Sequence, residues 1–227
     1  YPCLGSRKLV NLLKGEHFCV GRKLVRRLMQ AMGLYVIYPK PNLSKRDFRE
    51  SIVPYLLRNK VVDFPNQVWS IDITYIPIGH GHMYLTAIID CFSRKLMRWI
   101  LSDTLDTAPV LDTVKKAVGR YGVPAIINSD QGCQFTSGEY KNLLRQYGIR
   151  QSMDGKSRWA DNIMIERWFR SFKYEEAYLT QYNNIKEART AIGQYIRTYN
   201  FERHHSALDY QTPAECYYPA MLLPYVA

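Results

Sequence analysis

Apolar and polar residues alternate strictly just after residue 67. The odd-numbered positions from Trp69 to Tyr75 are apolar, and the even-numbered positions from Ser70 to Thr74 are polar. A period of two is the pattern of a β-strand with one face buried. It predicts a strand over 68–76. Two more apolar stretches predict strands over 83–89 and 95–101, with a Gly-His-Gly-His turn at 79–82 joining the first pair.

The hydrophobic period then changes to that of helices alternating with short strands. A helix over 107–121 has Pro109 in its first turn and Gly122 at its end. The remaining patterns predict a strand over 125–129, a helix over 137–147, a strand over 149–153, and helices over 161–176 and 185–199. A meander followed by alternating elements predicts an α/β fold, with a mixed sheet and helices on both faces. That element order is typical of ribonuclease-H-like folds.

A separate pattern occupies the first residues. Two short amphipathic segments predict a small all-α module over 1–36, with Gly33 as the cap of its second helix. Four basic residues of that helix lie largely off its apolar stripe: Arg22, Lys23, Arg26 and Arg27. A basic second helix is typical of a helix-turn-helix, which inserts it in the major groove. The alternative is a small helical bundle with a basic exterior.

Charge divides the chain in the same way. The formal net charge is +11, and residues 1–60 hold 13 Lys and Arg against Glu16, Asp47 and Glu50. The rest is nearly neutral, with 18 basic against 17 acidic residues. This asymmetry indicates a nucleic-acid-binding module, with a solvated basic surface as the alternative. A basic, proline-containing linker is expected over 37–62, and the catalytic core with its C-terminal helix and tail over 63–227.

Composition excludes several other classes of protein. Five cysteines without a C-x-x-C pair argue against a disulfide framework or a structural zinc site. No apolar run approaches the roughly 18 residues of a membrane span. We therefore expect no membrane partner and a cytoplasmic location. Because the chain begins with Tyr1 rather than Met, it is expected to be a fragment or a processed product.

Three carboxylates stand in contexts that suit phosphoryl transfer. Asp72 interrupts the first strand, Asp130 follows the fourth, and Glu166 lies on a helix, with 35 residues between it and Asp130. Two Mg²⁺ ions about 3.5–4 Å apart can hold both oxygens of an in-line displacement at phosphorus, and carboxylates are their usual protein ligands. The alternatives are a strand-edge residue, a turn former and a solvated helix residue. Asp90 competes as an acid, and we interpret it as a turn residue or a partner for Arg94.

The helix that carries Glu166 also presents candidates for DNA contact. Asn162, Glu166, Arg170 and Lys173 follow helical spacing and share one face, while apolar residues such as Trp168 and Phe169 occupy the packing side. Asn162, Arg170 and Lys173 are therefore expected to contact the DNA backbone beside the carboxylates.

Several segments resemble one family, the bacterial insertion-sequence transposases with a retroviral-integrase-type catalytic core, in particular the product of the second reading frame. The core segments are 65–77 (PNQVWSIDITYIP), 128–137 (NSDQGCQFTS) and 161–173 (DNIMIERWFRSFK). The stretches 199–203 (YNFER) and 212–215 (TPAE) resemble its C-terminal signature. The stretches 5–7 (GSR) and 22–29 (RKLVRRLM) resemble its helix-turn-helix.

The resemblance implies a function and its machinery. Asp72, Asp130 and Glu166 map onto the catalytic, metal-binding triad, and Lys173 onto the basic residue two turns after the glutamate. It implies Mg²⁺-dependent cleavage of element-end DNA and strand transfer by the freed 3′-hydroxyl, with two ions expected and Mn²⁺ able to substitute. It also implies a homo-multimer on DNA and an upstream-frame partner or fusion segment. Two alternatives remain: a catalytically silent helix-turn-helix protein from a degenerate element, and a hydrolytic nuclease of the same fold.

Overall fold

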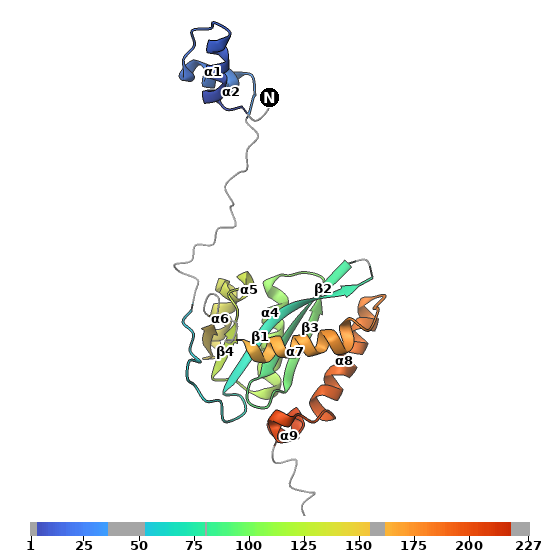
Figure 1. The fold of residues 1–227 in the computed structure, drawn as a ribbon. Coiled ribbons are helices and arrows are strands. Elements are labelled where there is room, and N and C mark those ends of the chain that lie inside the picture. The colour runs from blue at the N-terminus through green and yellow to red at the C-terminus, as the bar shows by residue number, and fades with distance from the viewer. Residues whose placement is uncertain (1–3, 36–52, 80, 155–161, 219–227) are drawn as a thin grey trace, which may run out of the picture. The chain divides into compact units, whose positions relative to one another are not determined.

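The computed structural model describes residues 4–35, 53–79, 81–154 and 162–218. The chain divides into two compact units, residues 1–47 and 48–227 (Figure 1). None of the helices in the described ranges is long and apolar enough to cross a membrane.

The first unit is a pair of short helices, α1 (Ser6–Gly15) and α2 (Arg22–Ala31). Val10 of α1 and Val25 of α2 are its buried residues. Gly33 ends the second helix in the left-handed conformation with φ of 66°, which a residue without a side chain adopts at no steric cost. The four basic residues predicted for DNA contact, Arg22, Lys23, Arg26 and Arg27, are all exposed on α2.

The second unit is built on a five-stranded sheet in the order β3-β2-β1-β4-β5. The strands β1 (Val68–Ile78), β2 (Gly81–Asp90) and β3 (Leu96–Ser102) form an antiparallel meander. The strands β4 (Ile126–Ser129) and β5 (Arg150–Met153) join the other edge of β1 in parallel. The sheet is therefore mixed, as the element order predicts.

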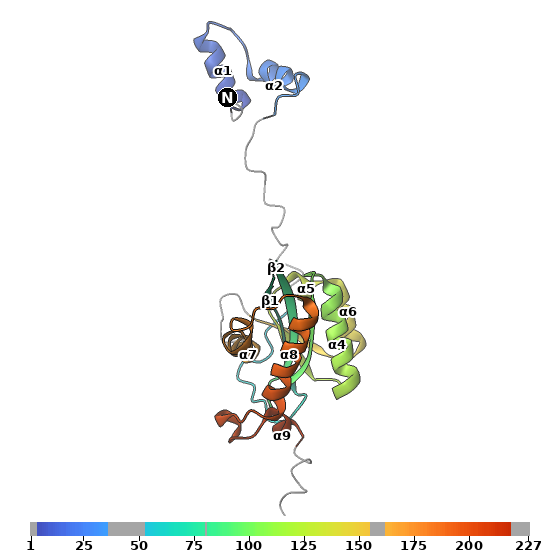
Figure 2. The same ribbon diagram turned by 90° about the vertical axis from the view of Figure 1, so that its right-hand side faces the viewer.

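Helices cover both faces of this sheet (Figure 2). The helices α4 (Thr107–Tyr121), α5 (Cys133–Thr136) and α6 (Gly138–Gln146) pack on one face, against Trp69, Ile71 and Ile88. On the other face, α7 (Ile163–Phe172) and α8 (Ile185–Phe201) pack against Leu85 and Leu101. Burial on both faces explains why the strands combine alternation with long apolar runs.

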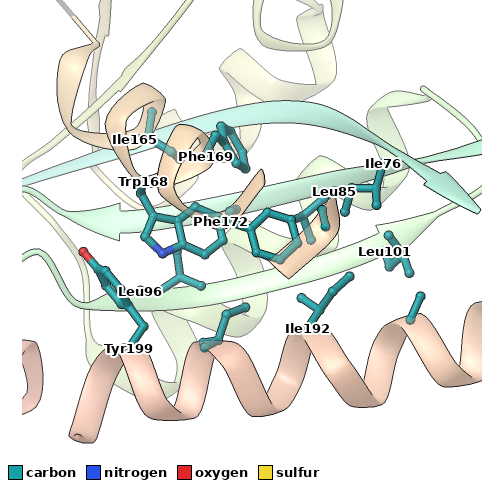
Figure 3. Packing of buried hydrophobic residues seen from close by; sticks show 14 of the residues in the cluster. Ile76, Leu85, Leu96, Leu101, Ile165, Trp168, Phe169, Phe172, Ile192 and Tyr199 are labelled. Atoms are coloured by element: carbon teal, nitrogen blue, oxygen red, sulfur yellow. The ribbon is translucent and has the colours of Figure 1, made fainter. Parts of the chain in front are cut away.

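The cluster under α7 fixes that helix (Figure 3). Trp168 stacks on Phe172 with ring centroids 5.5 Å apart, and meets the edge of Tyr199 from α8. Full burial of each such side chain contributes roughly 1.5–3 kcal/mol. Because Trp168 and Phe172 anchor one face of α7, the face that carries Glu166 is turned away from the core.

Two segments depart from the sequence expectations. Part of the expected linker belongs to the core: Val53 packs against the cluster around Trp69, and the Leu56 amide donates to Ser152 Oγ at 3.0 Å. The helix predicted to run to residue 176 changes at Lys173 into a π-helical turn, η1 (Lys173–Ala177).

The structure also adds short elements after α8. A 3-10 turn, η2 (Ser206–Leu208), precedes α9 (Pro213–Tyr217). Thr212 and Glu215 form a reciprocal capping box at the start of α9. Asp161, expected as the cap of the Glu166 helix, lies outside the described residues, and Asn162 is the residue that precedes α7.

Candidate active site

Strand register brings acidic residues together at one edge of the sheet. Ser70 on β1 pairs with Asn128 on β4, which pairs in turn with Ser152 on β5. Two residues further along these parallel strands stand Asp72, Asp130 and Asp154. Because the strands run in the same direction and in register, these acids follow the ladder at the same level. This is the carboxyl edge, where open α/β sheets place their ligand sites.

The helix α7 adds the fourth carboxylate. Its buried residues, Ile165, Trp168, Phe169 and Phe172, hold it on the sheet, and Glu166 is exposed on the opposite side. Partial burial raises the pKa of Glu166, and the negative charge of Asp130 raises it further. The helix therefore brings Glu166 within electrostatic reach of the strand carboxylates.

Asp72 has a strongly raised pKa. Burial raises its pKa from 3.8 to about 7, although the Ile73 amide donates to Asp72 Oδ1 at 2.7 Å and lowers it. Asp130, Glu166 and Asp154 all raise it further. Carboxylates that raise one another's pKa in a shared place are typical of sites that hold a cation or move a proton.

A cavity of about 210 Å³ opens beside these residues, and Asp72 and Asp130 both line it. The loop below Asp130 is closely fitted: the Gly132 amide donates to Asp130 Oδ1 at 2.8 Å, and Gln134 Nε2 donates to the Leu105 carbonyl at 2.7 Å. A Cβ on Gly132 would stand only 2.8 Å from Asp130 Oδ1. The absence of a side chain at residue 132 therefore lets the loop close on the carboxylate.

Side-chain amides of Asn128 and Gln131 stabilise the carboxyl edge of the sheet by hydrogen bonds to Asp154. Asn128 Nδ2 donates to Asp154 Oδ1 at 2.8 Å, and Gln131 Nε2 donates to the Asp154 carbonyl. Asn128 Nδ2 also contacts Asn162 Oδ1 at 3.4 Å, and Asn162 is only 2% exposed. Its burial departs from the DNA contact expected for it, because its amide faces Asn128 and not solvent.

The other expected DNA contacts of this unit lie at the surface. Arg170 is exposed on α7. Lys173 follows that helix, and its ammonium group lies 4.8 Å from the centre of the Tyr75 ring, close enough for a cation–π contact. Tyr75 is on β1, three residues after Asp72, so Lys173 contacts the strand that carries Asp72.

The structure brings together the three acids singled out in the sequence and adds one that sequence reasoning missed. Asp154 follows a four-residue strand, and its place became evident only from the parallel pairing of β4 with β5. Within the described ranges, no group of three or more His, Cys, Asp or Glu residues is drawn close enough to hold a metal ion as it stands.

Comparison with known proteins gives a consistent result. The integrase core domain family matches residues 63–158 and again 147–213, and an HTH-like domain family matches residues 1–42. A transposase for insertion sequence element IS904 of Lactococcus lactis is 33% identical over 93% of this chain and 86% of its own length. The InsK protein for insertion sequence element IS150 of Escherichia coli, whose name gives its transposase role provisionally, is 30% identical over 93% of this chain and 76% of its own length.

Solved structures match the second unit. The HTLV-2 integrase catalytic core domain in complex with magnesium has a TM-score of 0.52, with 19% identity over 68% of this chain and 97% of that chain. The catalytic core domain of BIV integrase has the same TM-score, with 18% identity over 70% of this chain and 99% of that chain. These likenesses establish the ribonuclease-H-like integrase fold. Taken with the relatives, they mean that this chain belongs to the family of insertion-sequence transposases with an integrase core domain.

Proposed function

We propose that this transposase uses Asp72, Asp130 and Glu166 as its catalytic set and that they hold Mg²⁺ during cleavage and joining of DNA. The observation that carries the proposal is the register of β1 and β4, which puts Asp72 and Asp130 at one level of the carboxyl edge. Glu166 is coupled electrostatically to both of them. The HTLV-2 integrase core, which has the same fold, was solved with magnesium.

The chemistry of the donors fits such an ion. All three side chains offer hard carboxylate oxygens, which Mg²⁺ prefers. Burial raises the pKa of Asp72, the neighbouring negative charges raise it further, and a bound cation would offset both effects. When bound, the metal would polarise the scissile phosphate and stabilise the attacking and leaving oxygens. We propose two ions, with Mn²⁺ able to replace Mg²⁺.

The chain's own groups have distinct tasks in this scheme. Asp72 and Asp130 are fixed by strands, so they define a rigid platform beside the cavity that both line. Glu166 is on α7 and is the third carboxylate of the catalytic set. Cleavage of a phosphodiester at the element end leaves a 3′-hydroxyl. In strand transfer that oxygen bonds to a target phosphorus, and the target's own 3′-oxygen leaves.

DNA contact is assigned to basic residues of both units. The exposed residues Arg22, Lys23, Arg26 and Arg27 of α2 would lie in or beside the major groove, as in helix-turn-helix proteins. Arg170 and Lys173 would contact the DNA backbone next to the carboxylates. We further propose that the active form is a homo-multimer on paired ends and that an upstream-frame partner or fusion segment contributes to end recognition.

A strand-transfer assay tests this function. The substrate is labelled DNA carrying the ends of the element, with Mg²⁺, and wild type is compared with Glu166→Gln. A matched control is Glu139→Gln, which makes the same change at an exposed position on α6. We expect joined products with wild type and the control, and none with Glu166→Gln.

The other outcomes favour the alternative functions. Cleavage without joining would indicate a hydrolytic nuclease of the same fold. Binding of DNA without any metal-dependent cleavage would indicate a catalytically silent DNA-binding protein. Products that persist in Glu166→Gln would overturn the assignment of the catalytic set.

A further inference from the structure

A second cavity, of about 190 Å³, lies on the same face of the sheet as α7 and α8. It is smaller than the roughly 300–1,000 Å³ clefts that take whole small-molecule ligands. Its lining comes from four separate parts of the chain: the β2–β3 connection, α7, α8 and the segment after α8. The residues that carry the argument are Arg94, Arg167, Trp168, Arg203 and His205.

Two buried polar atoms of the lining residues have no hydrogen-bond partner in the described part of the chain. Trp168 is 2% exposed, and its indole Nε1, which can only donate, has no partner in the described part of the chain. The Nε2 atom of His205 is also buried without a partner there. Native structures pair nearly all buried polar groups, so these two atoms leave the polar groups around the cavity incompletely satisfied.

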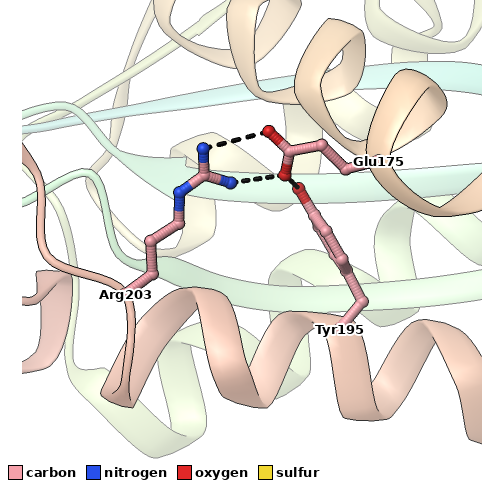
Figure 4. Close-up of polar contacts among 3 residues, drawn as sticks. All are labelled: Glu175, Tyr195 and Arg203. Carbon is pink, nitrogen blue, oxygen red and sulfur yellow. Dashed lines mark hydrogen bonds and ion pairs between the residues drawn. The ribbon is translucent and has the colours of Figure 1, made fainter.

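Positive charge in the cavity exceeds its compensation. Glu175 accepts two hydrogen bonds from the guanidinium of Arg203 and a third from the Tyr195 hydroxyl at 2.7 Å (Figure 4). Arg94 and Arg167 form no ion pair with any acid in the ranges that the structure describes. Burial lowers the pKa of His205, and the charges of Arg203 and Arg94 lower it further, which reflects the same uncompensated field.

The backbone holds Arg94 in an unfavourable conformation. Its φ is 60°, the left-handed region that glycine and asparagine enter easily and most other residues avoid. The Arg94 amide closes this turn on the Asp90 carbonyl at 2.9 Å. Arginine offers nothing to the turn itself, so the side chain that it sends to the cavity is the evident reason for its presence.

The cavity adjoins a second basic depression along α7. A shallow depression along α7, lined by Arg167, Arg170, Ser171, Tyr174 and Glu175, shares Arg167 and Ser171 with it. Arg167 directly follows Glu166 in the chain, and Arg170 lies about one turn beyond. The cavity and the depression therefore share Arg167 on the helix that also carries Glu166.

We propose that this cavity binds a phosphate of the DNA backbone, with Arg94 and Arg167 as its cationic contacts. The inference rests on the proposed function, because DNA is the polyanion that this transposase must hold. Guanidinium groups recognise phosphate by planar, paired hydrogen bonds, and Arg94 and Arg167 have no carboxylate partner in the described ranges that would compete for them. The contact carries no base specificity and fixes the duplex relative to Glu166.

The test is DNA affinity as a function of salt, measured by fluorescence anisotropy without divalent metal. The full chain is titrated onto a labelled duplex of about 30 base pairs and arbitrary sequence, from about 50 to about 300 mM KCl. The variants are Arg94→Asn and Arg167→Gln. The matched control is Arg145→Gln on α6, which loses the same charge on the other face of the sheet and whose described partner is Asn142.

Each cavity variant is expected to bind about fivefold to tenfold more weakly at about 100 mM salt and to lower the slope of log K against log salt by about one. The control is expected to keep the wild-type slope. Because asparagine adopts a positive φ readily, Arg94→Asn is expected to unfold at the same temperature as wild type or higher. Its weaker DNA binding is then not a consequence of unfolding.

Two results would overturn the proposal. The first is wild-type affinity and slope in both cavity variants. The second is thermal stabilisation by inorganic phosphate that Arg94→Asn abolishes while DNA binding is unchanged, which would identify a site for a free anion. Neither result involves catalysis, and Glu166→Gln is expected to bind DNA with the wild-type slope, so failure here is separate from failure of the catalytic assignment.

Discussion

Two acidic regions of the same pair of strands have opposite surroundings. Asp90 lies at the end of β2, opposite Trp69, and is fully buried. Its carboxylate accepts hydrogen bonds from the Asn66 amide at 2.9 Å and from the Ser93 amide and hydroxyl at 2.9 and 2.7 Å. Asp72, opposite Ala87, accepts one hydrogen bond from Ile73 and faces three other acids.

The difference separates a structural carboxylate from a chemical one. Burial raises the pKa of both groups, but at Asp90 the three donors and the charge of Lys95 act against it. At Asp72 the neighbouring acids act with burial, and the pKa reaches about 7. Of the two sequence interpretations of Asp90, a turn residue or a partner for Arg94, the side-chain contacts fit the first, since Ser93 and Asn66 bind its carboxylate. A carboxylate that accepts several hydrogen bonds stabilises a turn. A carboxylate with few donors and several acidic neighbours is typical of a site that binds a ligand.

The largest expected effect is a loss of strand-transfer activity when Asp72 is replaced. Asp72→Asn keeps the shape of the side chain and the contact with Ile73 but removes the negative charge, so it no longer serves as a cation ligand. We expect strand transfer to fall on the order of 10³-fold, which corresponds to about 4 kcal/mol of transition-state stabilisation. Product formation on labelled DNA measures it. Activity within about tenfold of wild type would contradict the assigned role.

Asp90 should show the opposite response, a loss of stability. Asp90→Ala leaves the Asn66 amide and the Ser93 groups without their buried acceptor. We expect the free energy of unfolding to fall by about 3 kcal/mol, measured by urea denaturation. The control is Asp112→Ala, which breaks a surface ion pair with Lys116 and is expected to cost less than about 1 kcal/mol. Equal effects of the two substitutions would remove the distinction.

Much of this comparison could be reached from the sequence, because periodicity and local signals determine it. The helix predicted over 107–121 has those bounds in the structure, since Gly122 ends it with φ of 86°. The meander, the parallel strands and the positions of Asp72, Asp130 and Glu166 also followed from pattern and resemblance. Residues 53–62 did not, because their attachment depends on Val53 and on a long-range acceptor, Ser152.

The remaining features depend on contacts between distant segments. Asp154 joins the carboxyl edge through the register of β5, which no local pattern encodes. Arg94, Arg167 and Arg203 meet at one cavity from a turn, a helix and the residues after a second helix. Asn162 fits the helical spacing of exposed residues, yet it is buried because Asn128 reaches it from β4. Sequence spacing predicts which residues share a face of a helix. Whether that face is exposed or buried depends on the segments that pack against it.

A third substitution effect concerns stability at the catalytic edge and depends on pH. Between about pH 4 and pH 7 folded Asp72 retains a proton that the unfolded chain has lost, so the free energy of unfolding decreases as pH rises through this window. Asp72→Asn lacks this penalty. At pH 8 without metal it should be more stable than wild type, on the order of 1–3 kcal/mol, and the advantage should shrink toward pH 4.

Urea denaturation at several pH values measures this effect. Asp90→Asn serves as the comparison, because hydrogen bonds to its carboxylate oppose the effect of burial. Because the pKa of Asp90 is also raised above its ordinary value, this variant should gain stability relative to wild type in the same direction as pH rises, but by less than Asp72→Asn. A variant of Asp72 that is less stable than wild type at pH 8 would mean that its charge is compensated in the folded state.

The smallest effect tests how closely the loop must fit the Asp130 carboxylate. Gly132 has φ of −54° and ψ of 147°, which alanine also adopts, so Gly132→Ala adds only a methyl group. That Cβ would stand 2.8 Å from Asp130 Oδ1 and 3.2 Å from Gln134 Oε1. The carboxylate must move aside, and we expect strand transfer to fall about tenfold while the free energy of unfolding changes by less than about 1 kcal/mol.

Gly138→Ala is the control, because a Cβ at that position meets nothing within 4 Å. It should leave activity unchanged. If Gly132→Ala were as active as its control, Asp130 would have to adopt a working position that does not depend on the Gly132 amide. The carboxyl edge would then tolerate movement in one of its acids. Loss of activity with stability retained would instead show that the glycine is needed for the placement of a charge, as the contrast between Asp72 and Asp90 leads us to expect.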